Sequence, residues 1–205
     1  MSRPNIKHLF IVLGCIIIIA GCTPNIDQDL KKKNPNTSHI IEEYISRVGK
    51  RLLIVSDDPE LPSLDIKFHF YNSNDQFFNV DLKTNKITVS KGMLEGLQNE
   101  AELAAILAIA LETIGHRNLS NIDSNVINYM YKAGYDPMVF VELQEECLDN
   151  KKDPDYNWLE TLFFPTELTT SKIEANKKLA LTLPQGMQRA QQRYLSNIRM
   201  LKKLD

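Results

Sequence analysis

Apolar and polar positions follow two different periods along the first half of the chain. Beginning at Ser38, which we take as an N-cap, apolar residues recur at helical spacing until the polar stretch DDPELPS. The stretches LDIKFHFY, QFFNVDLK and KITVS then alternate and predict strands, and Thr84-Asn85 predicts a hairpin between the last two. The apolar face of the predicted helix comprises Ile41, Tyr44, Ile45, Val48, Leu52 and Leu53.

The second half of the chain has a helical pattern throughout. GMLEGL predicts a short helix, and NEAELAAILAIALETIG predicts a long one that is rich in Ala and Leu and strongly apolar. Amphipathic patterns predict further helices over residues 125–132, 138–148, 171–181 and 187–204. The fold class predicted is therefore α+β, mostly helical, with one small sheet.

The N-terminus has the pattern of a secretory signal. MSRPNIKH carries two basic residues, LFIVLGCIIIIA is apolar, and IAGC ends at Cys22. The apolar run is shorter than the roughly 20 residues that a membrane-spanning helix needs. IAGC resembles the bacterial lipobox, in which the signal is cut before the cysteine and the cysteine is lipidated. We predict a signal over residues 1–21 and lipidation at Cys22; an ordinary signal peptide or an uncleaved anchor is the alternative.

Composition narrows the remaining possibilities. Residues 22–37 are polar without periodicity and predict a flexible tether, followed by a folded domain over 38–183 and an amphipathic helix over 184–205. Without the two basic residues of the signal, 22 basic residues face 26 acidic ones, so no nucleic-acid partner is expected. Cys147 would be the single remaining thiol, and the glutamates before it argue against a reactive thiolate.

One order of segments resembles a known family. VGKRLLIVSDDPELP, a strand pair ending KITVSKGMLEGLQNEAELAAILA, and YMYKAGYDP resemble the zinc endopeptidases that include the CAAX prenyl protease and HtpX, peptidase family M-forty-eight. The resemblance covers about residues 40–171 and is strongest to secreted lipoprotein members. It implies a zincin-like fold in which a small sheet packs on the active-site helix, with zinc as the cofactor.

The resemblance also shows what this chain lacks. In the family the long helix carries His-Glu-x-x-His, two zinc ligands and a general base on one helical face. Ile109 and Thr113 stand at the histidine positions, Ala110 stands at the base, and Leu119 stands where a third ligand, a glutamate, is expected. A catalytic zinc needs three protein ligands. We therefore predict no catalytic residues, no metal and no cofactor in this chain.

A displaced metal site is the alternative. Glu112 and His116 are four positions apart and so share a helical face, and Asp123 could supply a third ligand. This pair begins three residues after Ile109, a rotation of about 300° around the helix. The simpler interpretation pairs His116 with Glu112 or with the negative end of the helix dipole.

Two further features have a structural and a functional interpretation. His69 lies in a predicted strand, where a lone histidine is usually structural. The last predicted helix has an apolar stripe and several basic residues, so it would cover the domain's own core, dock a partner or lie on an anionic membrane.

The signal pattern predicts a lipid-anchored envelope protein facing the periplasm. The resemblance implies a pseudoprotease that binds envelope or unfolded proteins or an active paralogue. Thr23 after the lipidated cysteine favours the outer membrane if the host has two membranes. The competing hypotheses are an active zinc peptidase with a rearranged site and a purely structural lipoprotein.

Overall fold

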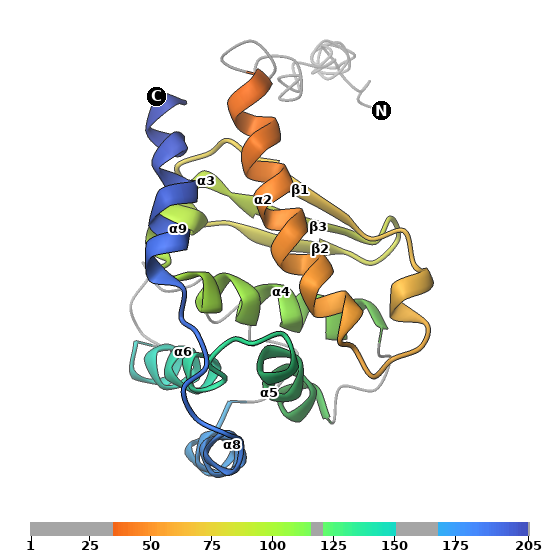
Figure 1. The fold of residues 1–205 in the computed structure, drawn as a ribbon, viewed down its shortest axis with the longest axis vertical. Coiled ribbons are helices and arrows are strands. Elements are labelled where there is room, and N and C mark those ends of the chain that lie inside the picture. Colours follow the sequence, from red (N-terminus) through yellow and green to blue (C-terminus); the bar gives the residue numbers. More distant parts are fainter. Residues whose placement is uncertain (1–34, 116–120, 151–167, 205) are drawn as a thin grey trace, which may run out of the picture. The chain divides into compact units, whose positions relative to one another are not determined.

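Helices and strands occur in the predicted order. The computed structural model describes residues 35–115, 121–150 and 168–204, which form a mixed α+β fold (Figure 1). Its strands are β1 (Lys67–Tyr71), β2 (Phe78–Asp81) and β3 (Lys86–Ser90). Its helices are α2 (Pro35–Ile54), α3 (Lys91–Gly96), α4 (Glu100–Gly115), α5 (Ile122–Lys132), α6 (Met138–Asp149), α8 (Thr170–Thr182) and α9 (Gln191–Ile198), with 3₁₀ turns η2 (Leu61–Ser63) and η5 (Arg199–Lys203).

Helix α2 begins earlier than its apolar pattern indicated. Ser38 is not the N-cap, because the helix already starts at Pro35, a residue whose fixed φ suits the first helical position. The first residues of α2 thus fall in the range that we assigned to the tether. Five residues of the predicted apolar face are buried, which confirms them, and the sixth, Leu53, is partly buried. The five buried residues are Ile41, Tyr44, Ile45, Val48 and Leu52.

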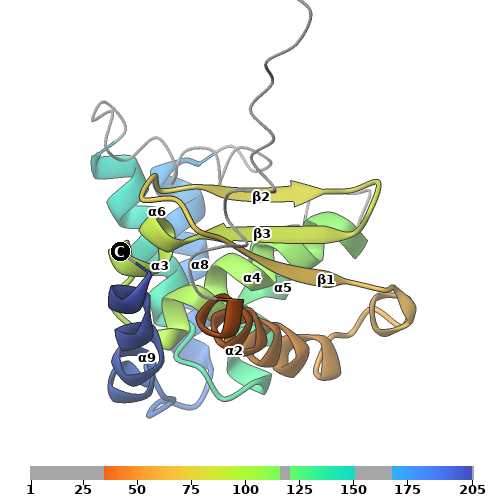
Figure 2. The ribbon, with the colours of Figure 1, turned by 90° about the horizontal axis from the view of Figure 1, so that it is seen from above.

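The sheet has the order β1-β3-β2. Strands β2 and β3 form the predicted antiparallel hairpin, in which Asn85 adopts a positive φ of 50°. Strand β1 pairs with β3 in parallel, with Phe68 opposite Ile87. Because β3 is central, four of its five residues are buried, whereas β1 alternates. Helix α2 packs along β1 on one face of the sheet (Figure 2).

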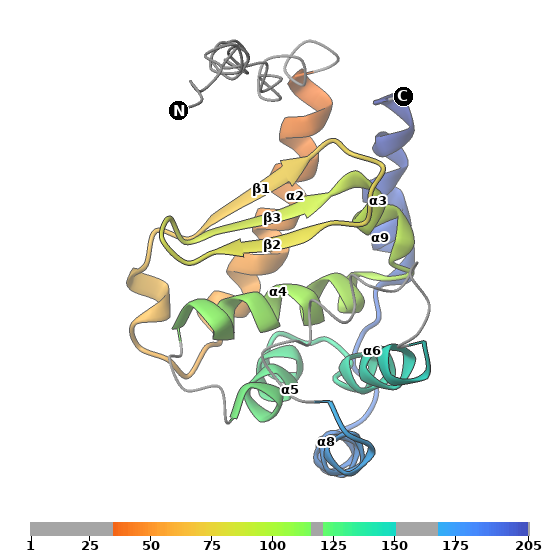
Figure 3. The ribbon, with the colours of Figure 1, turned by 180° about the vertical axis from the view of Figure 1, so that it is seen from behind.

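Helix α4 forms the centre of the domain. It contacts α2, α5 and α6, and it runs below the sheet beside the edge strand β2 (Figure 3). Between Glu100 and Glu112 every residue except Glu102 is buried. This burial explains why the sequence pattern is apolar on almost every side of the helix.

The turn from α5 into α6 places a tyrosine at the domain centre. Gly134, at a φ of 82°, ends α5: its N–H donates to Tyr131 O and the N–H of Tyr135 donates to Met130 O. This pair of bonds is a Schellman motif, which requires the left-handed conformation that glycine adopts readily. The side chain of Tyr135 consequently enters the core and is only 1% exposed.

The C-terminal segment differs at both ends from the helix predicted over residues 187–204, because the α-helix already ends at Ile198 and the 3₁₀ turn η5 follows it. Residues 187–190 are not helical, because Gln188 exchanges backbone hydrogen bonds with Gly134 and Asp136. Ala190 then adopts a left-handed φ of 53°, and α9 begins at Gln191. The C-terminal segment covers the domain's own core, the first of the three roles considered for it: Tyr194 of α9, Leu201 of η5 and Leu204 after it are buried.

Candidate functional site

The positions that match the family's zinc ligands lie on the inner part of α4. Ile109 is 4% exposed and Ala110 is fully buried, both within the apolar core. The hydroxyl of Thr113 donates to the carbonyl of Ile109 over 2.8 Å, a bond within one helical turn. Neither an isoleucine nor an alanine side chain has a lone pair to offer a metal, and threonine is not among the usual zinc ligands.

Glu112, one member of the alternative site, is directed toward α5. Its side chain is fully buried, and Oε2 accepts a hydrogen bond from Nδ2 of Asn125 over 2.7 Å. Burial, and then a hydrogen bond to Glu112, raise the pKa of the Tyr129 phenol. Glu112 thus belongs to a buried polar contact between α4 and α5.

Asp123, the second carboxylate of that site, is directed toward α8. Oδ2 accepts a hydrogen bond from Nδ2 of Asn176 over 2.9 Å and lies 3.3 Å from Nζ of Lys172. The same Asn176 amide donates to Oε1 of Gln144 on α6. In the described part of the chain, Asp123 Oδ1 and Gln144 Nε2 are buried and have no hydrogen-bond partner.

The two carboxylates therefore have separate surroundings. Asp123 and Asn125, the partner of Glu112, are two positions apart on α5, which is about 200° of rotation around the helix. His116 and Leu119 lie outside the described residues. Among residues 35–115, 121–150 and 168–204, no group of three or more His, Cys, Asp or Glu side chains is placed to hold a metal ion.

Other residues considered from the sequence have structural surroundings. Nδ1 of His69 lies 3.0 Å from Glu42 on α2, as expected for a histidine that joins strand to helix. Cys147 is buried in α6. Cys22 and the tether up to residue 34 lie outside the described residues, and no helix in the described part is long and apolar enough to cross a membrane.

A polar cluster that the sequence did not predict surrounds Glu100, the first residue of α4. This carboxylate is 3% exposed and accepts hydrogen bonds from the Tyr44 hydroxyl at 2.9 Å and the Tyr135 hydroxyl at 2.8 Å. Arg193 of α9 donates through Nε at 2.8 and 2.9 Å and through Nη2 at 2.5 Å. Burial alone would raise the pKa of Glu100, but the bonds from Arg193, Tyr135 and Tyr44 outweigh it and lower this pKa.

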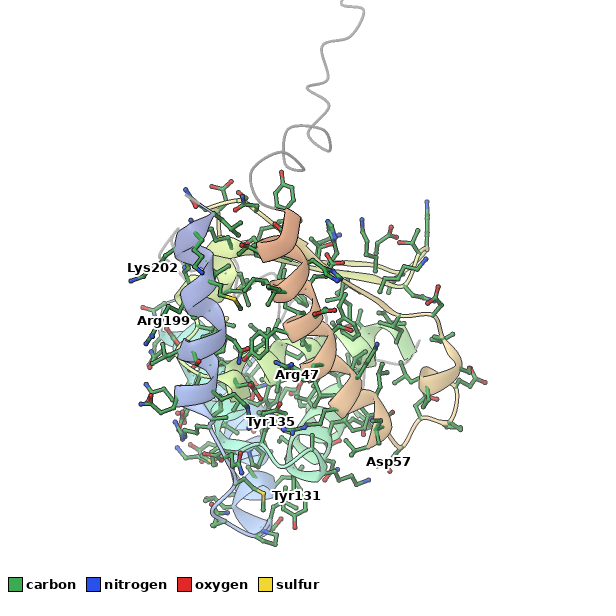
Figure 4. The ribbon with its side chains drawn as sticks, turned by 45° about the horizontal axis from the view of Figure 1, so that its top comes forward. Arg47, Asp57, Tyr131, Tyr135, Arg199 and Lys202 are labelled. Atoms are coloured by element: carbon green, nitrogen blue, oxygen red, sulfur yellow. The ribbon has the colours of Figure 1, made fainter. Side chains whose placement is uncertain are left out.

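A small crevice opens beside this cluster, between α2 and α9. It measures about 210 Å³ and is lined by Arg47, Val48, Arg51, Glu100, Tyr135 and Arg193. Arg47 lies above Tyr135 in Figure 4, on the side of α2 that faces α9. A wider groove of about 710 Å³ runs along α2 and shares Arg47 and Arg51 with the crevice. The i, i+4 spacing of these two arginines is the one sequence signal for this site.

Comparison with known proteins assigns no family: neither the family models nor the curated proteins contain a match to this chain.

Proposed function

We propose that this chain is a lipid-anchored protein of the bacterial cell envelope with a zincin-like domain that binds proteins and does not hydrolyse them. The observation that carries the proposal is the state of α4. Ile109 and Ala110 are core residues, and the Thr113 hydroxyl bonds to the helix backbone. A zinc-binding helix whose ligand residues were replaced by apolar core residues would have these surroundings at the former ligand positions.

The remaining parts of the proposal come from the N-terminal sequence and the domain surface. Lipidation at Cys22 and the tether would hold the domain on the periplasmic side of a membrane, and Thr23 favours the outer one. The groove along α2 offers a partner a surface with both charged and apolar side chains. Its partner would be an envelope or unfolded protein, or an active paralogue.

Metal content and proteolysis test this proposal together. The chain from Thr23 onward would be purified without chelator and without affinity histidines, and its zinc would be measured by mass spectrometry. We expect no stoichiometric zinc and no cleavage of an unfolded substrate such as reduced casein. Cleavage that a chelator abolishes would contradict the proposal.

A matched pair of variants separates a rearranged zinc site from adventitious zinc. His116→Ala removes the histidine of the alternative site, whereas His39→Ala removes an exposed histidine at the start of α2. Zinc that is lost in His116→Ala and kept in His39→Ala would place a metal at the alternative site, and cleavage lost in the same variant would establish the rearranged peptidase in place of the binding protein. Zinc that both variants keep would be adventitious.

A further inference from the structure

The crevice between α2 and α9 has an excess of positive charge. Three arginines line it, Arg47, Arg51 and Arg193, against the single carboxylate of Glu100. Its volume of about 210 Å³ corresponds to roughly seven water molecules at about 30 Å³ each. A compact anion, together with a few water molecules bound to it, therefore fits the space.

Glu100 is not available to neutralise the two arginines of α2. Its two oxygens already accept hydrogen bonds from Tyr44, Tyr135 and Arg193. Arg193 engages it through Nε and Nη2, the paired geometry in which a guanidinium binds a carboxylate most strongly. With this pair neutral overall, the net charge of about +2 at the crevice comes from Arg47 and Arg51.

Arg47 and Arg51 are held in place by aromatic rings and not by acids. The guanidinium carbon of Arg47 lies 5.4 Å from the Tyr44 ring centre, and that of Arg51 lies 5.5 Å from the Tyr135 ring centre. Their hydrogen bonds in the described structure are long, 3.5 Å from Arg47 to Asn197 and 3.4 Å from Arg51 to the Tyr135 hydroxyl. Neither forms an ion pair with a carboxylate of the described residues, whereas Arg189 and Arg193 both do.

The two rings are themselves fixed, because both tyrosine hydroxyls donate to the buried Glu100. Arg47 and Arg51 are four positions apart on α2 and so project from the same face, with Cβ atoms about 5–6 Å apart. A guanidinium stacked on a ring keeps its N–H edge available for an anion. Two such edges beside one small crevice form a prepared anion site.

We propose that this crevice binds a phosphate group, held between the guanidinium groups of Arg47 and Arg51 and next to Arg193. A phosphomonoester carries about −1.5 to −2 charges at neutral pH, which matches the excess charge of the crevice. It would come from a soluble phosphate compound or from a phospholipid headgroup. The site is independent of the proposed loss of zinc ligands, because Glu100 and Thr113 are about 20 Å apart along α4.

Titration with inorganic phosphate tests the proposal on the folded chain from Thr23 onward. The arginine Nε–H signals would be followed by NMR in wild type, Arg47→Gln, Arg51→Gln and the matched control Lys50→Gln. Lys50 is an exposed cation on the same helix that lines the wide groove but not the crevice. We expect phosphate to shift the signals of Arg47 and Arg51, and each arginine variant to bind about tenfold more weakly. Lys50→Gln should change the affinity less than about twofold.

Vesicles distinguish the two sources of phosphate. Cosedimentation with phosphatidic acid vesicles, compared with phosphatidylcholine vesicles, would be measured for the same four proteins. Selective binding of phosphatidic acid that the arginine variants lose identifies a lipid headgroup, and binding of free phosphate alone identifies a soluble ligand. Absence of both, or an equal loss in Lys50→Gln, would overturn the proposal, since it would leave only general attraction between charges.

Discussion

Arg193 donates hydrogen bonds to the carboxylate of Glu100 through two of its nitrogens, Nε and Nη2, although the two residues are 93 positions apart. The carboxylate is buried at the start of α4, in the middle of the chain, and the arginine projects from α9, near the C-terminus. A hydrogen bond to a charged group contributes about 1.5–3 kcal/mol, more than one between neutral groups. This contact therefore connects the C-terminal helix to the central one by more than apolar packing.

Arg193→Met should destabilise the domain by about 2–3 kcal/mol, because it leaves a buried carboxylate with only the two tyrosine hydroxyls. Chemical denaturation of the variant measures the loss. Arg199→Met is the matched control, since Arg199 is an exposed arginine of the same segment, and it should cost less than about 0.5 kcal/mol. An equal loss in both variants would show that the ion pair is not the cause.

The stabilising effect of this contact should depend on pH. Although burial opposes it, the pKa of Glu100 in the folded protein is held below its ordinary value of 4.5 by hydrogen bonds. A carboxyl whose pKa is lowered by folding stabilises the protein above its unfolded-state pKa and ceases to do so as pH falls through the folded-state pKa. The difference in unfolding free energy between wild type and Arg193→Met should shrink as the pH is lowered from about 7 to below about 4.

The variant should show this effect through its own carboxyl as well. Removing the arginine takes away its hydrogen bonds and its charge, which lower the pKa of Glu100, while burial still raises this pKa. We therefore expect the pKa of Glu100 to rise in Arg193→Met, so that protonation stabilises the variant relative to its neutral-pH state. Denaturation curves measured across this range for both proteins give the comparison. A difference that stays constant with pH would contradict an ionised Glu100 in the fold.

Gly92→Ala should disrupt the entry to α3. A Cβ atom at this position would lie 2.0 Å from the carbonyl oxygen of Asn74, and the Gly92 N–H donates to Ser73 O. Backbone cannot move aside as a side chain can, so we expect a loss of about 2–3 kcal/mol or more.

Gly96→Ala, on the same short helix, provides the comparison. Its Cβ would meet the end of the Gln76 side chain at 2.8 Å, and a flexible side chain can rotate away. Thermal denaturation should therefore show a large fall in melting temperature for Gly92→Ala and a small one for Gly96→Ala. Similar values for the two variants would mean that the clash with Asn74 is relieved.

Asn176→Ala should loosen the packing of α8 on α5 and α6. The amide of Asn176 donates to Asp123 and to Gln144, which are both buried, and Ala leaves these acceptors without that donor. The loss should be about 1–3 kcal/mol in unfolding free energy. Asn121→Ala, at an exposed position whose side chain forms no cap, should be nearly neutral.

Hydrogen exchange locates the effect of Asn176→Ala. Amides of α8 should exchange faster in this variant, while those of β3 and α2 should keep their protection until global unfolding. A uniform increase over the whole domain would mean that α8 does not open separately from the rest of the fold.

Apolar periodicity predicted most elements because it reports burial directly. The buried face of α2 and the almost wholly apolar α4 have the burial that their patterns indicated, whereas β3, expected to alternate, is buried at four consecutive residues because it is the central strand. The start of α9 was wrong because Gln188 pairs with the turn at Gly134, and this contact between distant residues leaves no periodic signal.

The surroundings of charged residues were harder to predict. Glu100 was not singled out from the sequence, because its three partners come from distant positions, 44, 135 and 193. Glu112 and Asp123 were considered together as one site, but each faces a different helix. Spacing along one helix predicts which residues share a face, and it does not predict what that face meets.

The packing of α9 against α2 also sets an order of events during synthesis. Tyr194 contacts Tyr44 with ring centres 6.4 Å apart, and 150 positions separate the two residues. At about 5–20 residues per second, a ribosome makes the second tyrosine roughly 8–30 s after the first. Until the C-terminal segment is made, the part of the apolar face of α2 that packs against α9 stays exposed. The incomplete chain therefore has an exposed apolar surface on α2. A chain truncated before residue 190 would keep that surface exposed and be a natural target for chaperones and proteases.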